Sequence, residues 1–376
     1  MSAPVQTCLP PFLLIPCSWH PAPPAINAQV SICLPTLNAR AFLEERLETI
    51  LSQTLTDWEL IVCDSHSTDG TWEYLSQWAH DPRVHLHQVP KEGLYAGWNE
   101  CLKRATGKYV YIATADDTCA PELLERLAEP MDGNENIAVA YCGYREIDGR
   151  GQELTVRRST FQKFIEPWMS ARHDVDGRAL FLITCAFDHN WGSVTGFAFQ
   201  RALLDKTGLF RTDMGMNADC EWALRTLLVS PLVAFIPGRL ATWRLHEAQA
   251  SRNWGMDDAR LCRDSMRDLL NDPRAGLPEA WKTVPAWSEQ LMLKREWSYE
   301  ELSELFRFVA RANPRKFLTQ CLRVGKQDPG MFFRQLFRLF AFPPMPTSSW
   351  EEHANHLLAT FPCDWPPVPI SSERPS

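Results

Sequence analysis

The sequence predicts an α/β protein, in which a mostly parallel, doubly wound sheet is followed by an α-helical C-terminal module. Short apolar runs alternate with segments of helical periodicity through the first half of the chain. Helical patterns alone continue from about residue 257. With 376 residues, 45% of them hydrophobic, the chain can form one large α/β domain and a smaller helical part.

Changes in composition divide the chain into four segments. Residues 1–28 form a Pro-rich leader that we expect to be disordered, and residues 29–250 contain the alternating pattern. A helical module is expected over residues 255–340, before a tail rich in Pro and Ser at 341–376. The leader has no basic segment before its apolar patch, so no signal peptide is predicted. No apolar run reaches the length of a transmembrane helix.

The strands are predicted from apolar runs bounded by turn residues. They are Val30–Leu34, Trp58–Cys63, Val84–Val89, the run that starts at Lys108, Ala138–Gly143, Ser193–Phe199, Leu232–Ile236 and Ala241–Leu245. The pattern weakens between Arg145 and Ala186, where we predict no element.

The helices are predicted from apolar periodicity and from capping residues. Asn38 can cap a helix over Arg40–Ser52, and Pro121 can start one that runs to about Glu129. One further helix is predicted to end near Trp78. Others are predicted over Gly93–Ala105, Arg201–Lys206, Asp219–Leu228, Asp257–Leu270, Tyr299–Arg311 and Pro314–Val324.

Acidic side chains follow two of the predicted strands. Asp64 follows the second strand, and Asp116 and Asp117 follow the run that starts at Lys108. Ligands of such sheets bind at the carboxyl ends of the strands, where these acids should converge. Carboxylates suit Mg²⁺ or Mn²⁺, which bind through one or two carboxylates and through substrate phosphates. The pattern therefore predicts a site for a nucleoside diphosphate and a divalent cation.

Several motifs, taken in their order along the chain, resemble glycosyltransferase family 2, whose catalytic domains have the Rossmann-like GT-A fold. They are Val30–Asn38, Asp64 with Ser67–Thr71, Ala105–Tyr109 and Ala115–Asp117. The match covers about residues 30–130 and continues more weakly to about His246. The resemblance implies a GT-A catalytic domain over residues 29–250. It also implies inverting, metal-dependent transfer of a sugar from a nucleotide-diphosphate sugar, with a UDP-sugar expected, to an acceptor hydroxyl.

The resemblance assigns one group of residues to the nucleotide. Pro35, Thr36 and Asn38 match the segment that lies against the nucleotide, and Asp64 matches the acid that contacts its base. The implied acceptor is a growing glycan or a lipid-linked saccharide, as in bacterial-type polysaccharide assembly.

A second group is assigned to the metal and to catalysis. Asp116 matches the metal-binding acid of the Asp-x-Asp motif, and Asp117 beside it is assigned to the nucleotide site. Asp219 matches the catalytic base, and His246 resembles the late His that meets the metal or the diphosphate. Mn²⁺ or Mg²⁺ is the implied cofactor.

Two positions depart from the family pattern. Thr114 stands where the first acid of Asp-x-Asp is usual, and Ser65 stands where a second acid usually follows Asp64. Asp116 must then do most of the metal binding, with Asp117 or His246 assisting.

Structural alternatives stay open for each of these residues. Asp64 could form only a turn, and the paired acids could cap the helix that begins near Pro121. Asp219 could be a first-turn acid that the helix dipole favours, which would leave Glu221 as the base. His246 could be an ordinary surface or core histidine.

The charge distribution bears on partners. The net charge of −8 argues against nucleic-acid binding. Between Arg307 and Phe340, however, eight basic residues face one acidic residue, which leaves thirty basic and forty-five acidic residues elsewhere. This basic, apolar-interrupted segment could lie on a membrane surface, or it could pack on the catalytic domain or on a second copy in a homo-oligomer. We expect a cytoplasmic protein, peripheral at the inner face of the membrane in the first case.

Other features of the sequence test the assignment. The 12 cysteines form no CxxC pair, which indicates reduced core residues. The polar, aromatic loop Asp188–Gly192 suits a sugar acceptor or a plain structural role, and Trp191 and Trp222 could stack on a sugar or pack in the core. A nucleotidyltransferase is one rival, but Pro35–Arg40 lacks the glycines of a phosphate loop. A catalytically weak glycan-binding or scaffolding relative is the other.

Overall fold

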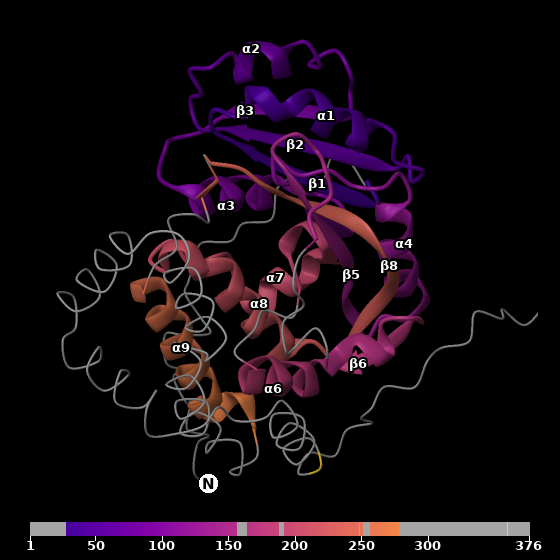
Figure 1. Ribbon diagram of the computed structural model, residues 1–376, viewed down its shortest axis with the longest axis vertical. Coiled ribbons are helices and arrows are strands. Elements are labelled where there is room, and N and C mark those ends of the chain that lie inside the picture. The colour runs from indigo at the N-terminus through magenta and orange to yellow at the C-terminus, as the bar shows by residue number, and fades with distance from the viewer. Residues whose placement is uncertain are drawn as a thin grey trace, which may run out of the picture.

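The computed structural model describes residues 28–155, 164–187, 192–247, 249–250, 256–277 and 359. These residues build one eight-stranded sheet with helices on both faces (Figure 1). The order of the strands is β3-β2-β1-β4-β7-β5-β8-β6. The predicted α/β class is confirmed.

The two halves of the sheet differ in direction. In the first half, parallel pairing joins β1 to both β2 and β4, and β2 to β3. In the second half, β7 is antiparallel to β4 and β5, and β6 is antiparallel to β8, while β5 and β8 are parallel. The sheet is therefore parallel where the nucleotide motifs lie and mixed beyond it. The strands are β1 (Val30–Thr36), β2 (Trp58–Asp64), β3 (Val84–Gln88), β4 (Tyr109–Ile112), β5 (Ile137–Asp148), β6 (His173–Asp176), β7 (Phe197–Gln200) and β8 (Leu232–Leu245).

The helices cover the sheet in two layers, because side chains alternate between its faces. In β1, Ile32 points into a core with α1 (Arg40–Leu51), α2 (Thr71–Ser76) and α4 (Leu123–Gly133), whereas Cys33 points into the opposite core. That second core contains helices α3, α6, α7, α8 and α9, several of which lie inside the curve of β5 and β8 (Figure 1). Their bounds are Leu94–Arg104, Gly177–Phe187, Leu204–Thr207, Ala218–Val229 and Met256–Asn271.

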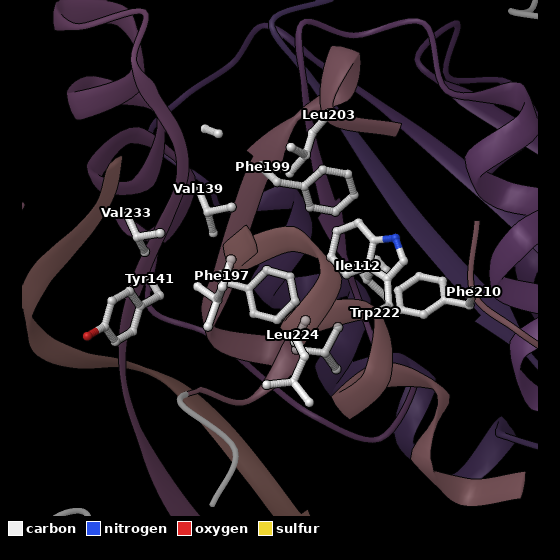
Figure 2. Close-up of a cluster of buried hydrophobic side chains, with 14 of the residues drawn as sticks. Ile112, Val139, Tyr141, Phe197, Phe199, Leu203, Phe210, Trp222, Leu224 and Val233 are labelled. Carbon is white, nitrogen blue, oxygen red and sulfur yellow. The ribbon is translucent and has the colours of Figure 1, made fainter. Parts of the chain in front are cut away.

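The second core is centred on Trp222 of α8, which is fully buried (Figure 2). Its ring lies 4.8 Å from that of Phe199 and 4.9 Å from that of Phe210, and its indole N–H donates to the Gly208 carbonyl at 2.9 Å. Trp222 is thus a packing residue. Its burial excludes the other interpretation that the sequence left open, in which Trp222 stacks on a sugar ring.

Three predicted strands differ from the structure. The strands predicted at Leu232–Ile236 and Ala241–Leu245 are one strand, β8, because Pro237 and Gly238 form a bulge opposite β5 instead of ending it. Gly238 has φ 115, a left-handed value that glycine adopts without strain. In the predicted strand Ser193–Phe199, residues 194–196 form a 3₁₀ turn. The strand β7 begins only at Phe197 and runs to Gln200.

Several sequence predictions lie partly or wholly outside the described residues. They concern the leader, the loop residues 188–191, most of the module at 255–340 with its basic segment, and almost all of the tail. In the weakly patterned insert, the described residues continue β5 and form β6 and α6. At the start of the helical module, α9 packs on α8 and buries Leu269 and Leu270 in the same core. None of the helices within the described ranges combines the length and apolar character needed to cross a membrane.

The family-like segment Ala105–Tyr109 has a structural explanation at the amino ends of the strands. The buried carboxylate of Glu59 accepts hydrogen bonds from the Ser31 hydroxyl at 2.5 Å, from the Thr106 N–H at 2.8 Å and from the Gly107 N–H at 3.2 Å. A Cβ at Gly107 would lie 2.6 Å from the Ser31 nitrogen, so no side chain fits there. Gly107 allows β4 to start against β1.

We predict that Gly107→Ala lowers the free energy of unfolding by about 1–3 kcal/mol, because the backbone must move to admit the methyl group. Urea titration followed by tryptophan fluorescence measures this. Gly133→Ala is the matched control, since nothing lies within 4 Å of its Cβ position, at the end of α4. An equal loss in both variants would contradict the prediction.

Candidate functional site

The nucleotide-side residues lie where the carboxyl ends of β1 and β2 meet. Thr36 and Asp64 are paired in register, and both are buried. Asp64 Oδ1 accepts hydrogen bonds from the Thr36 hydroxyl at 3.0 Å and from the Ser67 hydroxyl at 2.5 Å, and its Oδ2 accepts from the Ser67 N–H at 2.9 Å. This carboxylate is therefore held rigidly as an acceptor at the edge of the sheet.

Asn38 joins the loops that follow these two strands. Its backbone N–H donates to the Ser67 hydroxyl at 2.8 Å, and its side-chain oxygen accepts from the Thr68 N–H at 2.9 Å. Asn38 itself has φ 51, a left-handed conformation that asparagine tolerates better than most residues. Its predicted capping of α1 is not seen, because Ala39 precedes that helix.

Helix α3 approaches the same loops closely through Gly97. A Cβ there would lie 3.6 Å from the Ser65 hydroxyl and 3.8 Å from Pro35 Cβ. Ser65, which stands where a second acid is usual, is thus buried beneath α3. The helix and the nucleotide-side loops form one packed unit.

The metal-side residues are brought together from distant parts of the chain. Asp116 follows β4 and His246 follows β8, and their Oδ2 and Nε2 atoms are 2.9 Å apart. The His246 ring also packs on Phe42 of α1, with 4.6 Å between ring centroids. The sequence predicted both residues, and the structure makes them neighbours.

Arg244 of β8 holds the loop that contains Asp116 and Asp117. Its backbone N–H donates to Asp117 Oδ1 at 2.7 Å, and its Nε donates to the Asp116 carbonyl at 2.7 Å. The guanidinium is buried and forms an ion pair with Glu45 of α1 at 2.6 Å. One side chain therefore fixes the acidic loop against α1 and β8.

Asp117 is turned into the protein. It is buried, Arg244 donates to its Oδ1, and the Thr114 hydroxyl donates to its Oδ2. Burial, and then the charge of Asp116, raises the pKa of Asp117 to about 7. This geometry favours Asp116 over Asp117 for a metal and gives Asp117 an internal structural role.

The residues present fit a divalent cation that keeps other ligands. No group of three or more His, Cys, Asp or Glu side chains in the described part of the chain is arranged to hold a metal ion. Asp116 Oδ2 and His246 Nε2, which form a hydrogen bond at 2.9 Å, would supply two ligands, and this separation is compatible with one octahedral ion, whose adjacent ligands stand about 3 Å apart. The remaining positions suit phosphate oxygens and water.

Asp219 lies in the first turn of α8 and faces α3. Its Oδ1 is 2.9 Å from the Tyr95 hydroxyl and also accepts from the Cys220 N–H at 2.9 Å. Burial raises the pKa of Asp219, although these hydrogen bonds act in the opposite direction. A carboxylate whose basicity is raised in this way suits a general base.

Glu221, the alternative base, is already paired. Its two oxygens lie 2.7 Å and 2.9 Å from the Arg225 guanidinium, and both side chains are buried. Arg225 also donates to the carbonyls of Thr207 and Leu209. This ion pair ties α8 to the preceding loop, so the geometry favours Asp219 as the base.

Sequence reasoning missed the partners that hold these residues. The sequence motifs contain neither Tyr95, which holds Asp219, nor Arg244, which holds Asp117. The apolar face of α3 contained Tyr95 as an ordinary core residue, and no local signal connects it with Asp219 across 124 positions.

Comparison with known proteins identifies a family model and several relatives. Residues 31–193 match the model of Glycosyl transferase family 2. An uncharacterized protein of Mycobacterium tuberculosis, MT1568, is 28% identical over 72% of this chain and 84% of its own length. Chondroitin synthase of Escherichia coli is 30% identical over 34% of this chain and 18% of its own length. The chain spans half or less of the length of two putative glycosyltransferases of Bacillus subtilis, EpsE and TuaG, and of this chondroitin synthase.

The fold also matches solved structures. TarS 1–349 of S. aureus in complex with UDP has a TM-score of 0.55, with 18% identity over 88% of this chain and 87% of that one. The complex of the same protein with UDP-GlcNAc has a TM-score of 0.57. At this identity the likeness establishes the fold, and it agrees with the GT-A architecture that the motifs predicted.

We predict opposite effects on stability for the two acids of α8. Glu221→Gln should lower the free energy of unfolding by about 3–5 kcal/mol, because it leaves the buried Arg225 charge without its partner. Asp219→Asn should leave stability unchanged or raise it near neutral pH, because it removes a carboxylate that burial disfavours.

Unfolding measured across pH tests both predictions. Because the folded-state pKa of Asp219 is raised, its contribution to wild-type stability falls as pH rises through that pKa. Asp219→Asn should flatten this slope. Stability that falls as much in Asp219→Asn as in Glu221→Gln would refute the comparison.

Proposed function

We propose, from the premise that residues 31–193 are a glycosyl transferase family 2 domain, that this chain is an inverting, metal-assisted glycosyltransferase. It moves a sugar from a nucleotide-diphosphate sugar to an acceptor hydroxyl. The acceptor is a growing glycan or a lipid-linked saccharide, in keeping with the chondroitin synthase among its relatives.

The observation that supports this most is the Asp116–His246 pair. These two metal-type ligands come from opposite halves of the sheet and meet 2.9 Å apart. Asp116 follows β4, which pairs with β1, and β1 ends beside Asp64. A nucleoside diphosphate bound at Asp64 through its base can therefore extend along one sheet edge toward Asp116.

The chain's own residues divide the chemistry. Asp64 and the loop Pro35–Asn38 hold the nucleoside, and Asp116 and His246 would hold a divalent cation. When bound, the cation stabilises the charge that develops on the leaving diphosphate. Asp219 accepts the proton of the acceptor hydroxyl as its oxygen bonds to the anomeric carbon and the bond to the diphosphate breaks. Attack opposite the leaving group inverts that carbon.

Nucleoside-diphosphate release from a panel of nucleotide-sugars, with and without Mn²⁺ or Mg²⁺, tests the proposal. UDP-GlcNAc is the first donor to try, since TarS has been solved with it. We expect release that requires a divalent cation, and NMR of the product should show inverted configuration. Calorimetry that finds no metal-dependent nucleotide binding, together with no turnover of any donor, would favour a non-catalytic relative.

We predict that Asp116→Ala lowers the rate of sugar transfer by about 100-fold or more, because it removes the only carboxylate placed for the cation among the described residues of this loop. Asp117→Asn should keep the rate within about tenfold, because an amide can still accept from Arg244 and still pair with the Thr114 hydroxyl.

The two variants control for one another, since they change adjacent acids in one loop. Titration with Mn²⁺ should show a raised metal requirement for Asp116→Ala and little change for Asp117→Asn. Wild-type turnover in Asp116→Ala would remove the metal assignment.

A further inference from the structure

Tyr95 touches the proposed base from a different part of the fold. It lies in the first turn of α3, and its hydroxyl oxygen is 2.9 Å from Asp219 Oδ1 and 3.0 Å from the Met216 carbonyl. These two acceptors flank the start of α8. The Tyr95–Asp219 hydrogen bond joins α3 to the residue that is proposed to take the proton of the acceptor hydroxyl.

The hydroxyl has one proton and two acceptors within reach. A carboxylate is the stronger acceptor, so the proton is donated to Asp219 while that residue is ionised. Once Asp219 has taken up the acceptor proton, the Met216 carbonyl can accept instead. The buried hydroxyl then keeps a partner in both protonation states of Asp219, which avoids the cost of an unsatisfied donor.

The Tyr95 ring is held rigidly. It is 5% exposed and packs against two other rings, with 5.1 Å between its centroid and that of Trp98 and 5.9 Å between its centroid and that of Phe210. Asn99 fixes Phe210 in turn, because its side chain donates to the Phe210 carbonyl at 2.8 Å and accepts from the Phe210 N–H at 3.0 Å. The position of the hydroxyl is therefore set by α3 and its packing.

We propose that Tyr95 is a positioning residue for Asp219, which fixes the orientation of the carboxylate and couples the base to the nucleotide-side loops through α3. Two residues along the same helix, Gly97 packs on Pro35 and Ser65. The proposal rests on the proposed function, in which Asp219 is the base.

The surroundings of Asp219 define what removing this hydroxyl does. The titratable groups that face it are Tyr95 from α3 and Cys220 beside it, with Cys262 of α9 behind Cys220. Burial and the nearby Asp219 charge raise the pKa of Tyr95, so it acts only as a donor. The hydrogen bond with Cys262 and burial raise the pKa of Cys220, which is therefore neutral. Loss of the Tyr95 hydrogen bond must then raise the pKa of Asp219 further.

Tyr95→Phe tests the proposal, because it removes the hydroxyl and keeps the ring. We expect kcat to fall about 10-fold to 100-fold on the pH plateau, from loss of a hydrogen bond to a charged group. The acidic limb of kcat/KM should move to higher pH, and KM for the donor should change little.

Tyr109→Phe is the matched control. It removes a tyrosine hydroxyl that donates to a carboxylate, Asp132, at 2.7 Å, but at the start of β4 and away from the carboxyl edge. We expect a wild-type plateau and a wild-type acidic limb. Thermal unfolding of both variants identifies any general loss of structure.

Asp219→Asn separates the two ways in which the idea can fail. If Asp219→Asn keeps wild-type transfer, Asp219 is not the general base, and that part of the proposed function is wrong. If Asp219→Asn is inactive while Tyr95→Phe keeps both the plateau and the acidic limb of the wild type, Asp219 is the base and Tyr95 does not position it.

Discussion

The hydrogen bonds of Arg244 hold the proposed active site together. A buried guanidinium is costly unless its donors are satisfied, and here the Asp116 carbonyl and the Glu45 carboxylate accept from it at 2.7 Å and 2.6 Å. Its backbone N–H binds Asp117, so the strand and the acidic loop are fixed at two points. His246 follows two residues later, and its Nε2 atom lies 2.9 Å from Asp116 Oδ2 in that loop.

The sequence predicted most of the fold because local patterns determine most of it. The strands of the parallel half and the helices α1, α3 and α8 follow from apolar runs, periodicity and flanking turn residues. The continuity of β8 could not be predicted from the sequence, because Pro237 and Gly238 are typical of a strand end. The pairing of β8 with β5 shows that they form a bulge instead. The helix α6 was not predicted, because residues 179–183 form an unbroken apolar run, and a short run of this kind does not distinguish a helix from a buried strand.

The candidate site was predictable as a set of residue types, but its internal assignments were not. Asp116 and Asp117 are adjacent and chemically identical, and only burial and partners show that one points out and the other in. Glu221 and Asp219 differ in the same way, through Arg225 and Tyr95. The Glu221–Arg225 pair is local, four residues apart in α8. The contacts of Asp116 with His246, of Asp117 with Arg244 and of Asp219 with Tyr95 each span more than a hundred residues, and no short-range pattern records them.

The hydrogen bond between Thr114 and Asp117 limits which side chains suit position 114. An ionised carboxylate there would have no proton to donate and would place a second negative charge against a buried one. One of the two carboxyl groups would then have to stay protonated, and burial already raises the pKa of Asp117 in that direction. A variant with the first acid of Asp-x-Asp would therefore hold a proton inside this loop.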